Sequence, residues 1–544
     1  MKEIYLKKPR ALRCLLQIAA LAVFLVSACK KTQPEQAIPE EASGKSKAGA
    51  SISVASSDAE TMFNAYNSAF LVNSGGNTFY KYAFNNGNPD NFWELALDIM
   101  VAEDAYERSG TAANRTLVNN LCTSYLRIHP PPFDWDGWND DVAWVGLMLA
   151  RGYQITGTPE LRTQAEYCFN FVYNRGWDTQ YNGGGIWEQQ PNYPGVTEII
   201  KEALSNNTTG KLGCILYQVT GNTDYRTKAQ RIYDWSRSRI YNASTGEVYR
   251  GIYRDNAISY GPAVYNQGTF IDFAAHLHRI TGNATVLADA QQAADYVMNN
   301  GGNLAPGGII SNTATHLITW GDEFARGVGH LCRWNPQYWN RYYNFMNNNA
   351  NAIWRNRRTD YSITWNGWNA ASPLDGTARA ATFASAVAML QYTPAINPAS
   401  GSLSNGTYRI INRATGLALD ASGGGTANGT PLIQYGYNGG NNQRWTVTSL
   451  GNGQYSIRNV ASGRSIDVNG ASNVPGTATI LYDYQGSANQ RITLGTPASG
   501  YYTLFFQHDY QVLDVSGGST AANTPIIQWG YSGGNNQQWQ FLAP

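Results

Sequence analysis

Two different hydrophobic periods divide the chain. From about residue 57 to 393, apolar residues return every three or four positions, which is the spacing of amphipathic helices. From residue 404 to 544 this period is absent, and short runs typical of strands alternate with turn residues. The stretch 394–403 between them is rich in Pro, Ala and Ser. The pattern therefore predicts an all-α domain, a linker and an all-β domain.

A recurrent stop signal punctuates the helical region. Residues 153–157, 217–221 and 278–282 each end in Thr-Gly, and Gly is the usual residue that closes a helix. A polar start follows each stop, as at Thr158-Pro159, where Thr can cap and Pro can take the first helical position. The hairpins recur about every 45 to 65 residues, so the helical region has room for six of them. Six hairpins fit a closed (α/α)6 barrel, with an open α-solenoid as the alternative.

The β region repeats itself three times. Asp420, Asp467 and Asp514 stand at the same place in successive copies. Each copy has room for about four short strands and cannot bury its apolar face alone, so the repeat predicts a threefold β barrel. Two other kinds of residue recur with the same period of 47 residues. One is an aromatic residue (Tyr435, Tyr482 and Trp529), and the other is an Asn (Asn442, Asn489 and Asn536).

Residues 404–544 resemble the ricin-type β-trefoil lectins. The resemblance rests on Leu-Asp-x-Ser-Gly-Gly at 419–424 and 513–518, and on the Gln-x-Trp runs that close the first and third copies. It implies that the recurring Asp, aromatic and Asn of each copy hold a sugar, while the closing Trp belongs to the core. A carboxylate accepts two hydroxyls and an aromatic face stacks on a sugar ring, which agrees with these roles. The middle copy closes with Ile492 and is the copy most expected to keep the fold without binding.

The sharpest polar feature of the helical half is the pair Asp140-Asp141 at the start of a predicted helix, among three Trp residues. Adjacent carboxylates repel each other, which destabilises the fold, so the pair favours a catalytic role. Helix capping is the alternative, with Asn139 or Asp140 as the N-cap and Asp141 favourable to the helix dipole. If the pair is structural, the other candidate acids are Asp134, Asp136, Asp322 and Glu323.

Residues 57–393 resemble glycoside hydrolase family 76, which comprises retaining endo-α-1,6-mannanases with an (α/α)6 barrel. The resemblance rests on the Asp pair with its following Val-Ala-Trp, on Gly-Gly-Gly-Ile-Trp at 183–187, on 201–206 and on Tyr-Asn-Gln-Gly at 265–268. It implies Asp140 as nucleophile and Asp141 as acid/base. The substrate-binding residues that it implies are Trp187, Asn206, Asn266 and Gln267. The chain departs from the family pattern at Glu188, where a second Trp is usual, and at Glu202, where Asn is usual.

Those catalytic roles are chemically coherent. A retaining glycosidase needs two carboxyls about 5 to 5.5 Å apart. Neighbours on the first turn of a helix reach that separation when their rotamers diverge. The helix N-terminus favours the ionised form of Asp140, whose charge should raise the pKa of Asp141.

Composition narrows the partners. The 39 basic and 38 acidic side chains balance, which argues against nucleic acid as a binding partner. The sequence also predicts a monomer. Aromatic residues make up 12% of the chain beside 55 Gly, which suits a neutral polysaccharide, although a Tyr-rich surface without a ligand is the alternative. Two further classes remain: a non-catalytic glycan-capture protein, and an (α/α)6 hydrolase of another polysaccharide, such as an unsaturated-uronide hydrolase. The latter needs basic residues to seat a carboxylate, whereas these loops offer amides and aromatics.

The N-terminus predicts export. Residues 1–28 combine basic residues, an apolar run too short to span a bilayer, and Ser-Ala before Cys29, which resembles a bacterial lipobox. Acylation of Cys29 would make the protein a lipoprotein of the bacterial outer membrane, on its surface or periplasmic face. A plain cleaved signal peptide is the alternative. Residues 29–56 predict a disordered tether.

The remaining cysteines and the histidines predict no metal and no cofactor. No Cys-x-x-Cys pair occurs, and His276 and His278 face different directions on a helix, so no ligand cluster is expected. Buried free thiols are expected, with a disulfide as the alternative, at Cys122, Cys168, Cys214 and Cys332.

Overall fold

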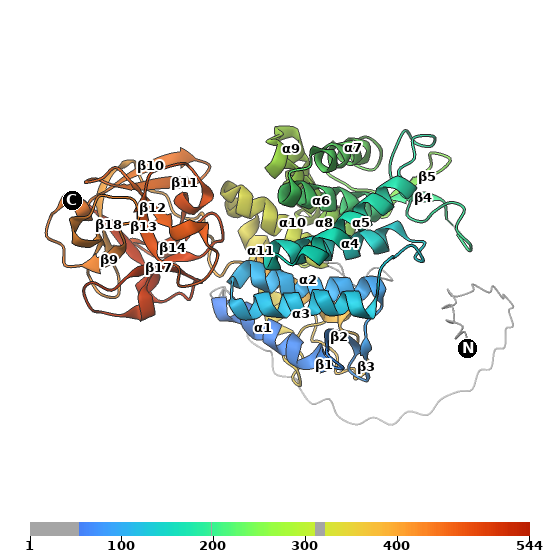
Figure 1. Cartoon of the computed structure of the whole chain (residues 1–544), viewed down its shortest axis with the longest axis horizontal. Coiled ribbons are helices and arrows are strands. Elements are labelled where there is room, and N and C mark those ends of the chain that lie inside the picture. The colour runs from blue at the N-terminus through green and yellow to red at the C-terminus, as the bar shows by residue number, and fades with distance from the viewer. Residues whose placement is uncertain (1–53, 197, 311–320) are drawn as a thin grey trace, which may run out of the picture. The chain divides into compact units, whose positions relative to one another are not determined.

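The structure is a computed structural model that describes residues 54–196, 198–310 and 321–544. Helices dominate the described chain up to Tyr392, and strands dominate from Gly406 onward (Figure 1). The predicted signal peptide, Cys29 and nearly all of the predicted tether lie outside the described residues. No helix in the described ranges combines the length and apolar character needed to cross a bilayer.

Six inner helices form a closed ring. Each packs against two others, and the circle closes where the last, α12, packs against the first, α2. This closure confirms the (α/α)6 barrel and excludes the open solenoid. The inner helices are α2 (Phe92–Ser109), α4 (Asn139–Thr156), α6 (Ala203–Thr220), α8 (Val264–Thr281), α10 (Gly321–Trp334) and α12 (Ala381–Tyr392).

Six outer helices cover this ring. They are amphipathic, because only one side of each meets the inner helices. They are α1 (Ser56–Phe70), α3 (Ala112–Ile128), α5 (Pro159–Gly176), α7 (Thr223–Arg239), α9 (Ala284–Met298) and α11 (Trp339–Arg355).

The predicted glycine stops are confirmed. Gly157, Gly221 and Gly282 end three inner helices with φ of 76°, 71° and 69°, a left-handed conformation that glycine adopts without strain. Pro159 begins α5 as predicted. Thr158 takes the N-cap position, but its hydroxyl accepts no helix N–H; it donates to Asn119 Oδ1 at 2.7 Å.

Two small antiparallel sheets lie within the helical half and were not predicted. One contains β1 (Leu71–Ser74), β2 (Asn77–Ala83) and β3 (Asn86–Pro89). The other contains β4 (Ile200–Glu202), β5 (Gly251–Tyr253) and β6 (Ile258–Ser259). Most of these strands are too short to show a period of two, so hydrophobic patterning gave no signal for them.

Charged side chains occupy part of the ring interior. Arg326 on α10 is fully buried and donates to Asp104 of α2 from Nε and Nη2, at 3.0 and 2.8 Å to Oδ2. Its Nη1 donates to Asp322 and to Glu323 of its own helix, at 2.6 Å each. Buried charges of this kind are tolerated only when they are paired.

The β part is a threefold barrel with four strands in each copy, as predicted. Six strands, β7, β10, β11, β14, β15 and β18, pair in a closed circle, and three hairpins (β8–β9, β12–β13 and β16–β17) complete the copies. The first copy is β7 (Gly406–Asn412), β8 (Ala418–Ala421), β9 (Leu432–Tyr435) and β10 (Trp445–Gly451). The second is β11 (Gln454–Asn459), β12 (Ser465–Val468), β13 (Thr479–Tyr482) and β14 (Ile492–Ala498). The third is β15 (Tyr501–Phe506), β16 (Val512–Val515), β17 (Ile526–Trp529) and β18 (Trp539–Leu542).

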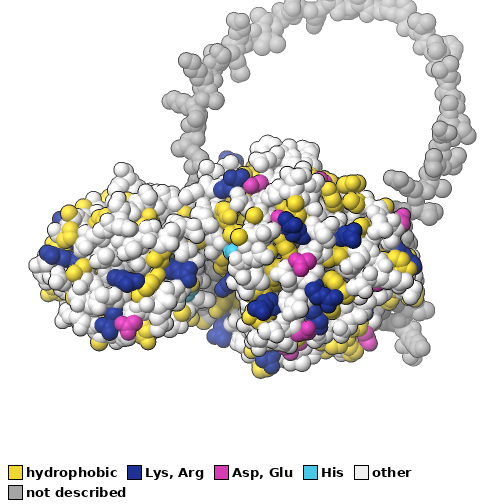
Figure 2. Space-filling model, turned by 90° about the horizontal axis from the view of Figure 1, so that it is seen from above, with side chains coloured by type: hydrophobic (Ala, Val, Ile, Leu, Met, Phe, Trp, Pro, Cys, Tyr) yellow, Lys and Arg dark blue, Asp and Glu magenta, His cyan; other side chains and the backbone are white. Residues whose placement is uncertain are grey.

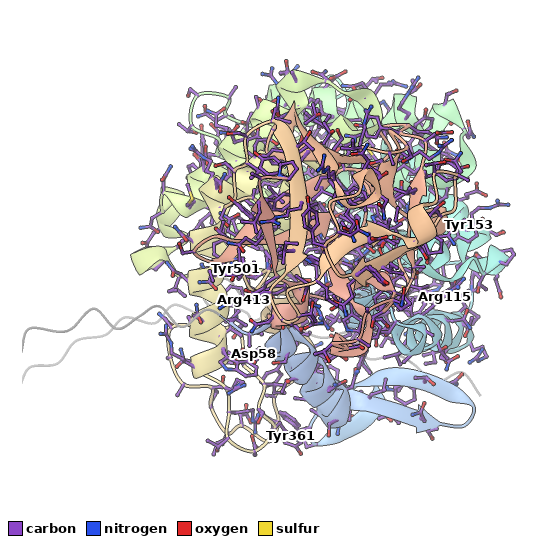
Figure 3. All side chains as sticks on the ribbon, turned by 90° about the vertical axis from the view of Figure 1, so that its left-hand side faces the viewer. Asp58, Arg115, Tyr153, Tyr361, Arg413 and Tyr501 are labelled. Atoms are coloured by element: carbon purple, nitrogen blue, oxygen red, sulfur yellow. The ribbon has the colours of Figure 1, made fainter. Side chains whose placement is uncertain are left out.

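Equivalent residues fill the barrel core. Trp445 and Trp539 are fully buried, and their indole N–H groups donate at 3.0 Å to the carbonyls of Leu419 and Leu513. Ile492 is fully buried at the matching place in the middle copy. A cross-copy contact joins the first and third copies, where the Arg413 guanidinium lies 4.5 Å from the centre of the Tyr501 ring (Figure 3).

The face of the described residues seen in Figure 2 is mostly uncharged. On the face seen in Figure 2, Lys and Arg side chains lie singly or in small groups among Asp, Glu and apolar side chains. The described residues on that face therefore form no continuous basic surface.

Candidate active site

The first turn of α4 is held in place by its neighbours. Arg175 of α5 donates to the carbonyls of Asp136 (2.6 Å) and Trp138 (3.1 Å) and to Asn139 Oδ1 (2.6 Å). Asn139 in turn donates from Nδ2 to the Trp187 carbonyl at 2.7 Å. Trp138 takes the N-cap position, and no side chain caps the helix. The capping explanation for Asn139 and Asp140 is therefore wrong.

Asp140 and Asp141 stand at this fixed helix start with different exposure. Asp140 is buried, and its Oδ1 has no hydrogen-bond partner among the described residues. Asp141, the next residue, is only half-buried. A buried carboxylate oxygen without a partner is costly, so it marks a place where a ligand can supply the missing donor.

Burial and neighbouring negative charges raise the pKa of both carboxyls well above the ordinary range. For Asp141, burial contributes most and the charge of Asp140 comes next, in the predicted direction. For Asp140, burial and then the charge of Glu188 raise the pKa, while the backbone N–H groups of Asp140 and Asp141 lower it. The helix N-terminus thus favours the Asp140 anion as predicted, but burial outweighs that effect. Two such groups titrate as a pair.

The Gly-rich loop beside α4 is fastened by Lys201. Its buried ammonium donates to the carbonyls of Asp178 (2.6 Å), Tyr181 (2.6 Å) and Gly184 (2.5 Å). It also lies 4.4 Å from the centre of the Trp187 ring. Burial lowers the pKa of Lys201 to about 8. Lys201 therefore fixes the loop through three carbonyl oxygens.

The four predicted substrate-binding residues are all buried. Asn206 accepts from the Ile186 N–H at 2.8 Å and donates to the carbonyls of Ile186 and Glu202, so its amide holds the loop instead of facing a ligand. Gln267 likewise bonds the Gly246 carbonyl (3.0 Å) and the Val248 N–H (2.7 Å). Backbone groups thus use the polar atoms of both amides, which sequence patterns cannot reveal.

The other two behave differently. Trp187 packs under the Lys201 ammonium and donates from Nε1 to Asp178 Oδ2 at 3.2 Å. Asn266 at the start of α8 is buried, and its Nδ2 has no hydrogen-bond partner among the described residues. Of the four, Asn266 is the one whose side chain keeps a free donor.

Two exposed aromatic residues, Trp135 and Tyr193, border the segment that leads into the Asp pair. Trp135 is 54% exposed, and its ring centre lies 4.8 Å from that of Phe92 at the start of α2. Tyr193 donates from its hydroxyl to the Trp135 carbonyl at 2.9 Å, and its ring covers Gly137, where a Cβ would overlap it. These rings offer faces on which a sugar can stack. Hydrophobic patterning did not single out Tyr193, which lies in a loop.

The other candidate acids named in the sequence analysis either bind other residues or lie exposed. Asp136 accepts from the Trp138 N–H at 2.7 Å and so shapes the turn before α4. Asp322 and Glu323 are bound by Arg326 inside the ring. Asp134 is exposed. The Asp140-Asp141 pair is therefore the best placed of these acids for chemistry on a ligand.

A second acidic pair, Glu188 and Glu202, lies beside Asp140. Glu202 is buried, and its Oε1 is 2.6 Å from Arg250 Nε. Arg250 also bonds Glu198 at 2.8 Å. Burial, followed by the charge of Glu188, raises the pKa of Glu202 well above the ordinary range. Only departure from the family pattern signalled these two residues in the sequence.

The prediction that the histidines form no cluster is wrong. Atoms of Asp272, His276 and His330 lie within 4.8 Å of one another, because α8 and α10 are neighbours in the ring. His330 Nδ1 lies 2.7 Å from Asp272 Oδ1, and Nε2 lies 3.1 Å from Glu107 Oε2. Burial alone lowers the pKa of His330, but Asp272 and Glu107 outweigh it and raise the pKa above its ordinary value. Asp272 also pairs with Lys211, so an ammonium and the His330 ring both face this carboxyl.

The four cysteines in the described residues are free and buried, as expected. Burial raises the pKa of each thiol.

The first and third trefoil copies share one polar geometry. Asp420 Oδ2 accepts from Asn442 Nδ2 at 3.0 Å, and Asp514 Oδ2 accepts from Asn536 Nδ2 at the same distance. The neighbouring Gln of each copy donates to the same oxygen at 2.6 Å. The other carboxylate oxygen of Asp420 and of Asp514 accepts no hydrogen bond from the described residues. Burial raises the pKa of Asp514 to about 6.

The middle copy is arranged differently. Asn489 Nδ2 donates to the Val468 carbonyl at 3.1 Å. Asp467 is buried in a similar place, and burial raises its pKa. The aromatic side chains of all three copies, Tyr435, Tyr482 and Trp529, are exposed at 41%, 38% and 47%. The stacking faces are thus open in every copy, and in the middle copy Asn489 bonds a backbone carbonyl while it also lies beside Asp467.

Comparison with known proteins identifies the family. The sequence matches the family model described as "Glycosyl hydrolase family 76" over residues 53–401, which is more than half of the chain. The chain belongs to glycosyl hydrolase family 76. Beyond the family 76 region, residues 395–482 and 488–543 match the model described as "Ricin-type beta-trefoil lectin domain-like".

Relatives of the family 76 region are mannan-acting proteins. The mannan endo-1,6-alpha-mannosidase DCW1 of Candida glabrata is 29% identical over 161 residues, which cover 27% of this chain and 34% of that relative. This chain therefore spans about a third of the length of that relative.

Solved structures share the fold. An alpha-1,6-mannanase of Salegentibacter sp. HEL1_6, an inactive variant with two consecutive Asp changed to Asn and bound to alpha-1,6-mannotriose, matches with a TM-score of 0.55 at 24% identity. The match covers 62% of this chain and 98% of that one. A family 76 mannosidase of Bacteroides thetaiotaomicron matches with a TM-score of 0.52 at 16% identity, over 62% of this chain and 96% of that one.

Proposed function

We propose that this protein is a glycoside hydrolase that cleaves α-1,6-mannosidic bonds in mannan with retention of anomeric configuration. The observation that carries the proposal is the Asp140-Asp141 pair, fixed at the start of an inner helix with a buried carboxylate oxygen that lacks a partner. Relatives named for action on α-1,6-mannan support the choice of substrate.

The geometry suggests how the two carboxyls divide the work. Asp140, the deeper of the two, has backbone N–H groups that stabilise its anion, which suits the nucleophile that attacks the anomeric carbon. Asp141 is more exposed, and burial and Asp140 raise its pKa, which suits a group that protonates the leaving oxygen. After the first step the Asp141 carboxylate accepts a proton from the water that releases the glycosyl group from Asp140.

Replacement of either carboxyl by an amide tests the assignment. Asp140→Asn and Asp141→Asn keep the side-chain shape, and each should lower the rate on linear α-1,6-mannan by at least about a thousandfold. Asp134→Asn is the matched control, because this acid is nearby in the chain but exposed. NMR of freshly released product should show the α-anomer first. Full activity in either variant moves the chemistry to another carboxyl, and initial β-anomer refutes retention.

The trefoil copies complete the proposal. Three exposed aromatic faces, each beside a buried Asp, support binding of the polysaccharide by the β part. Three weak sites on one polymer reinforce each other through effective concentration. The proposed location is the bacterial outer membrane, with a lipid anchor at Cys29. Its support is the lipobox-like sequence before this residue.

A further inference from the structure

A buried Asp-His-His cluster joins two neighbouring inner helices. Asp272 and His276 lie one turn apart on α8, so their side chains leave the same side of that helix, and His330 reaches them from α10. Asp272 Oδ1 is 2.7 Å from His330 Nδ1 and 3.6 Å from His276 Nε2. Ligand atoms that surround one ion tetrahedrally at about 2.0 to 2.2 Å are about 3.3 Å apart. The cluster therefore has the size of a site for one metal ion.

The ring of His276 is buried with both nitrogens unsatisfied. Its side chain belongs to a residue that is only 5% exposed, and neither Nδ1 nor Nε2 has a hydrogen-bond partner among the described residues. The ring packs edge-on against Trp334, with 4.7 Å between the ring centres. A buried polar group without a partner is costly, whereas a metal ion binds a neutral imidazole nitrogen directly.

The other two side chains of the cluster are oriented from behind. His330 Nε2 lies 3.1 Å from Glu107 Oε2, so this carboxylate can accept the Nε2 proton and leave the Nδ1 lone pair facing Asp272. The second oxygen of Asp272 pairs with the Lys211 ammonium, which leaves Oδ1 facing the two rings. A carboxylate behind a histidine and a bonded second oxygen are typical supports of the ligands of a protein-bound metal.

The buried ion pairs around the cluster contain more acids than bases. Arg279, which is also nearby, lies over the Trp334 ring at 4.5 Å and joins no ion pair among the described residues. With the carboxyls ionised and both histidines neutral, the connected network carries two negative charges without a counterpart, which a divalent cation would balance. Its acids are Glu103, Asp104, Glu107, Asp272, Asp322 and Glu323, and its bases are Arg151, Lys211, Arg326 and Arg333.

We propose that Asp272, His276 and His330 bind one zinc ion, which links α8 to α10 inside the ring. This departs from the expectation of no metal in the sequence analysis. Two imidazoles and one carboxylate are a donor set that zinc favours, and a water can complete the tetrahedron. The ion takes the place of a proton between His330 Nδ1 and Asp272. Asp272 lies about 9 Å further along α8 than Asn266 of the candidate active site, so the zinc has a structural role that does not depend on the proposed function.

Zinc binding by the full chain tests the proposal. Protein stripped with a chelator and then dialysed against micromolar zinc should retain one zinc per chain by elemental analysis. Zinc at about 100 times its Kd should raise the melting temperature by about 3 to 5 °C, because it binds the folded form alone. Co²⁺ in place of zinc should give the intense visible absorption of a tetrahedral site. No retained zinc together with an unchanged melting temperature overturns the proposal.

Two substitutions locate the ion. His276→Phe removes one ligand but keeps a flat ring against Trp334, and His330→Gln removes another. Each should lose the bound zinc and the rise in melting temperature. His278→Phe is the matched control, because His278 lies on the same helix outside the cluster, with Nδ1 2.9 Å from the Asn283 carbonyl. It should bind zinc as the unaltered protein does.

Zinc retained by His276→Phe at the level of the unaltered protein would place the metal elsewhere and overturn the assignment. If that variant does not fold, the zinc content, melting temperature and Co²⁺ spectrum of the unaltered protein decide the matter. A protein that binds zinc in this way but does not cleave mannan would refute the proposed function and leave the zinc site standing.

Discussion

Arg326→Met should destabilise the helical barrel far more than an equivalent change at the surface. Met replaces the unbranched aliphatic stem of Arg326 with a similar apolar chain and lacks the guanidinium, which donates to Asp104, Asp322 and Glu323. All four side chains are completely buried. Removal of one partner from a buried ion pair typically costs about 3 to 5 kcal/mol, because the remaining charge has no solvent.

Two other contacts of Asp104 reduce this loss. Arg151 donates to Asp104 at 2.7 Å and the Tyr392 hydroxyl at 3.0 Å. Burial raises the pKa of Asp104, but Arg326 and Arg151 outweigh it and leave that pKa below its ordinary value. We therefore expect Arg326→Met to lower the free energy of unfolding by about 3 kcal/mol, the lower end of that range.

Arg341→Met is the matched control. Arg341 also binds one Asp with two bonds, since its Nε and Nη2 lie 2.7 Å from the two oxygens of Asp295. Its side chain is 46% exposed, however, so water can replace the partner and the expected loss is about 0.2 to 1 kcal/mol. Urea unfolding followed by far-ultraviolet circular dichroism at the helical band measures both variants. Similar losses in the two would refute the argument that burial makes the Arg326 network costly to break.

Two further predictions concern the trefoil and the anchor. Replacement of Asp420, Asp467 and Asp514 by Ala should weaken each site by about 2 kcal/mol, so that binding to polymer collapses while turnover of a short soluble oligosaccharide is unchanged. Unaltered polymer binding in a pull-down would contradict the lectin role, and slow turnover by a folded triple variant would give the trefoil a part in catalysis. Metabolic labelling with a fatty acid should mark the protein and be abolished by Cys29→Ala, whereas label that persists would disprove the lipobox interpretation.

Regular features of the fold could be predicted because local physics determines them. Gly157 and its equivalents end helices through a backbone conformation that glycine adopts freely. Because this stop signal recurs along the helical region, it predicted the helical hairpins. The threefold repeat predicted the strands because a barrel of copies needs each copy to supply the same elements. Ring closure, by contrast, depends on the contact between α2 and α12, which lie far apart in the chain.

The candidate site was predicted only in part, because burial depends on tertiary contacts. Asn206 is polar and lies in a motif, yet its amide bonds the backbone of a loop twenty residues away. Glu188 becomes part of the acidic group only because β4 and α4 meet at its backbone. His276 and His330 come from different helices, so spacing along one helix could not show that they meet.

The different aromatic residues of the three trefoil copies make one copy optically distinct. The β part contains three Trp residues, and Trp445 and Trp539 are sealed in the core while Trp529 is 47% exposed on the third stacking face. A sugar that covers Trp529 would change its emission and shield it from a soluble quencher. The first and second copies present Tyr435 and Tyr482 and would give no such signal. Because Trp135 of the helical half is exposed too, the part of the sugar-dependent change in Trp emission that Trp529→Tyr removes reports occupancy of the third copy, without any attached dye.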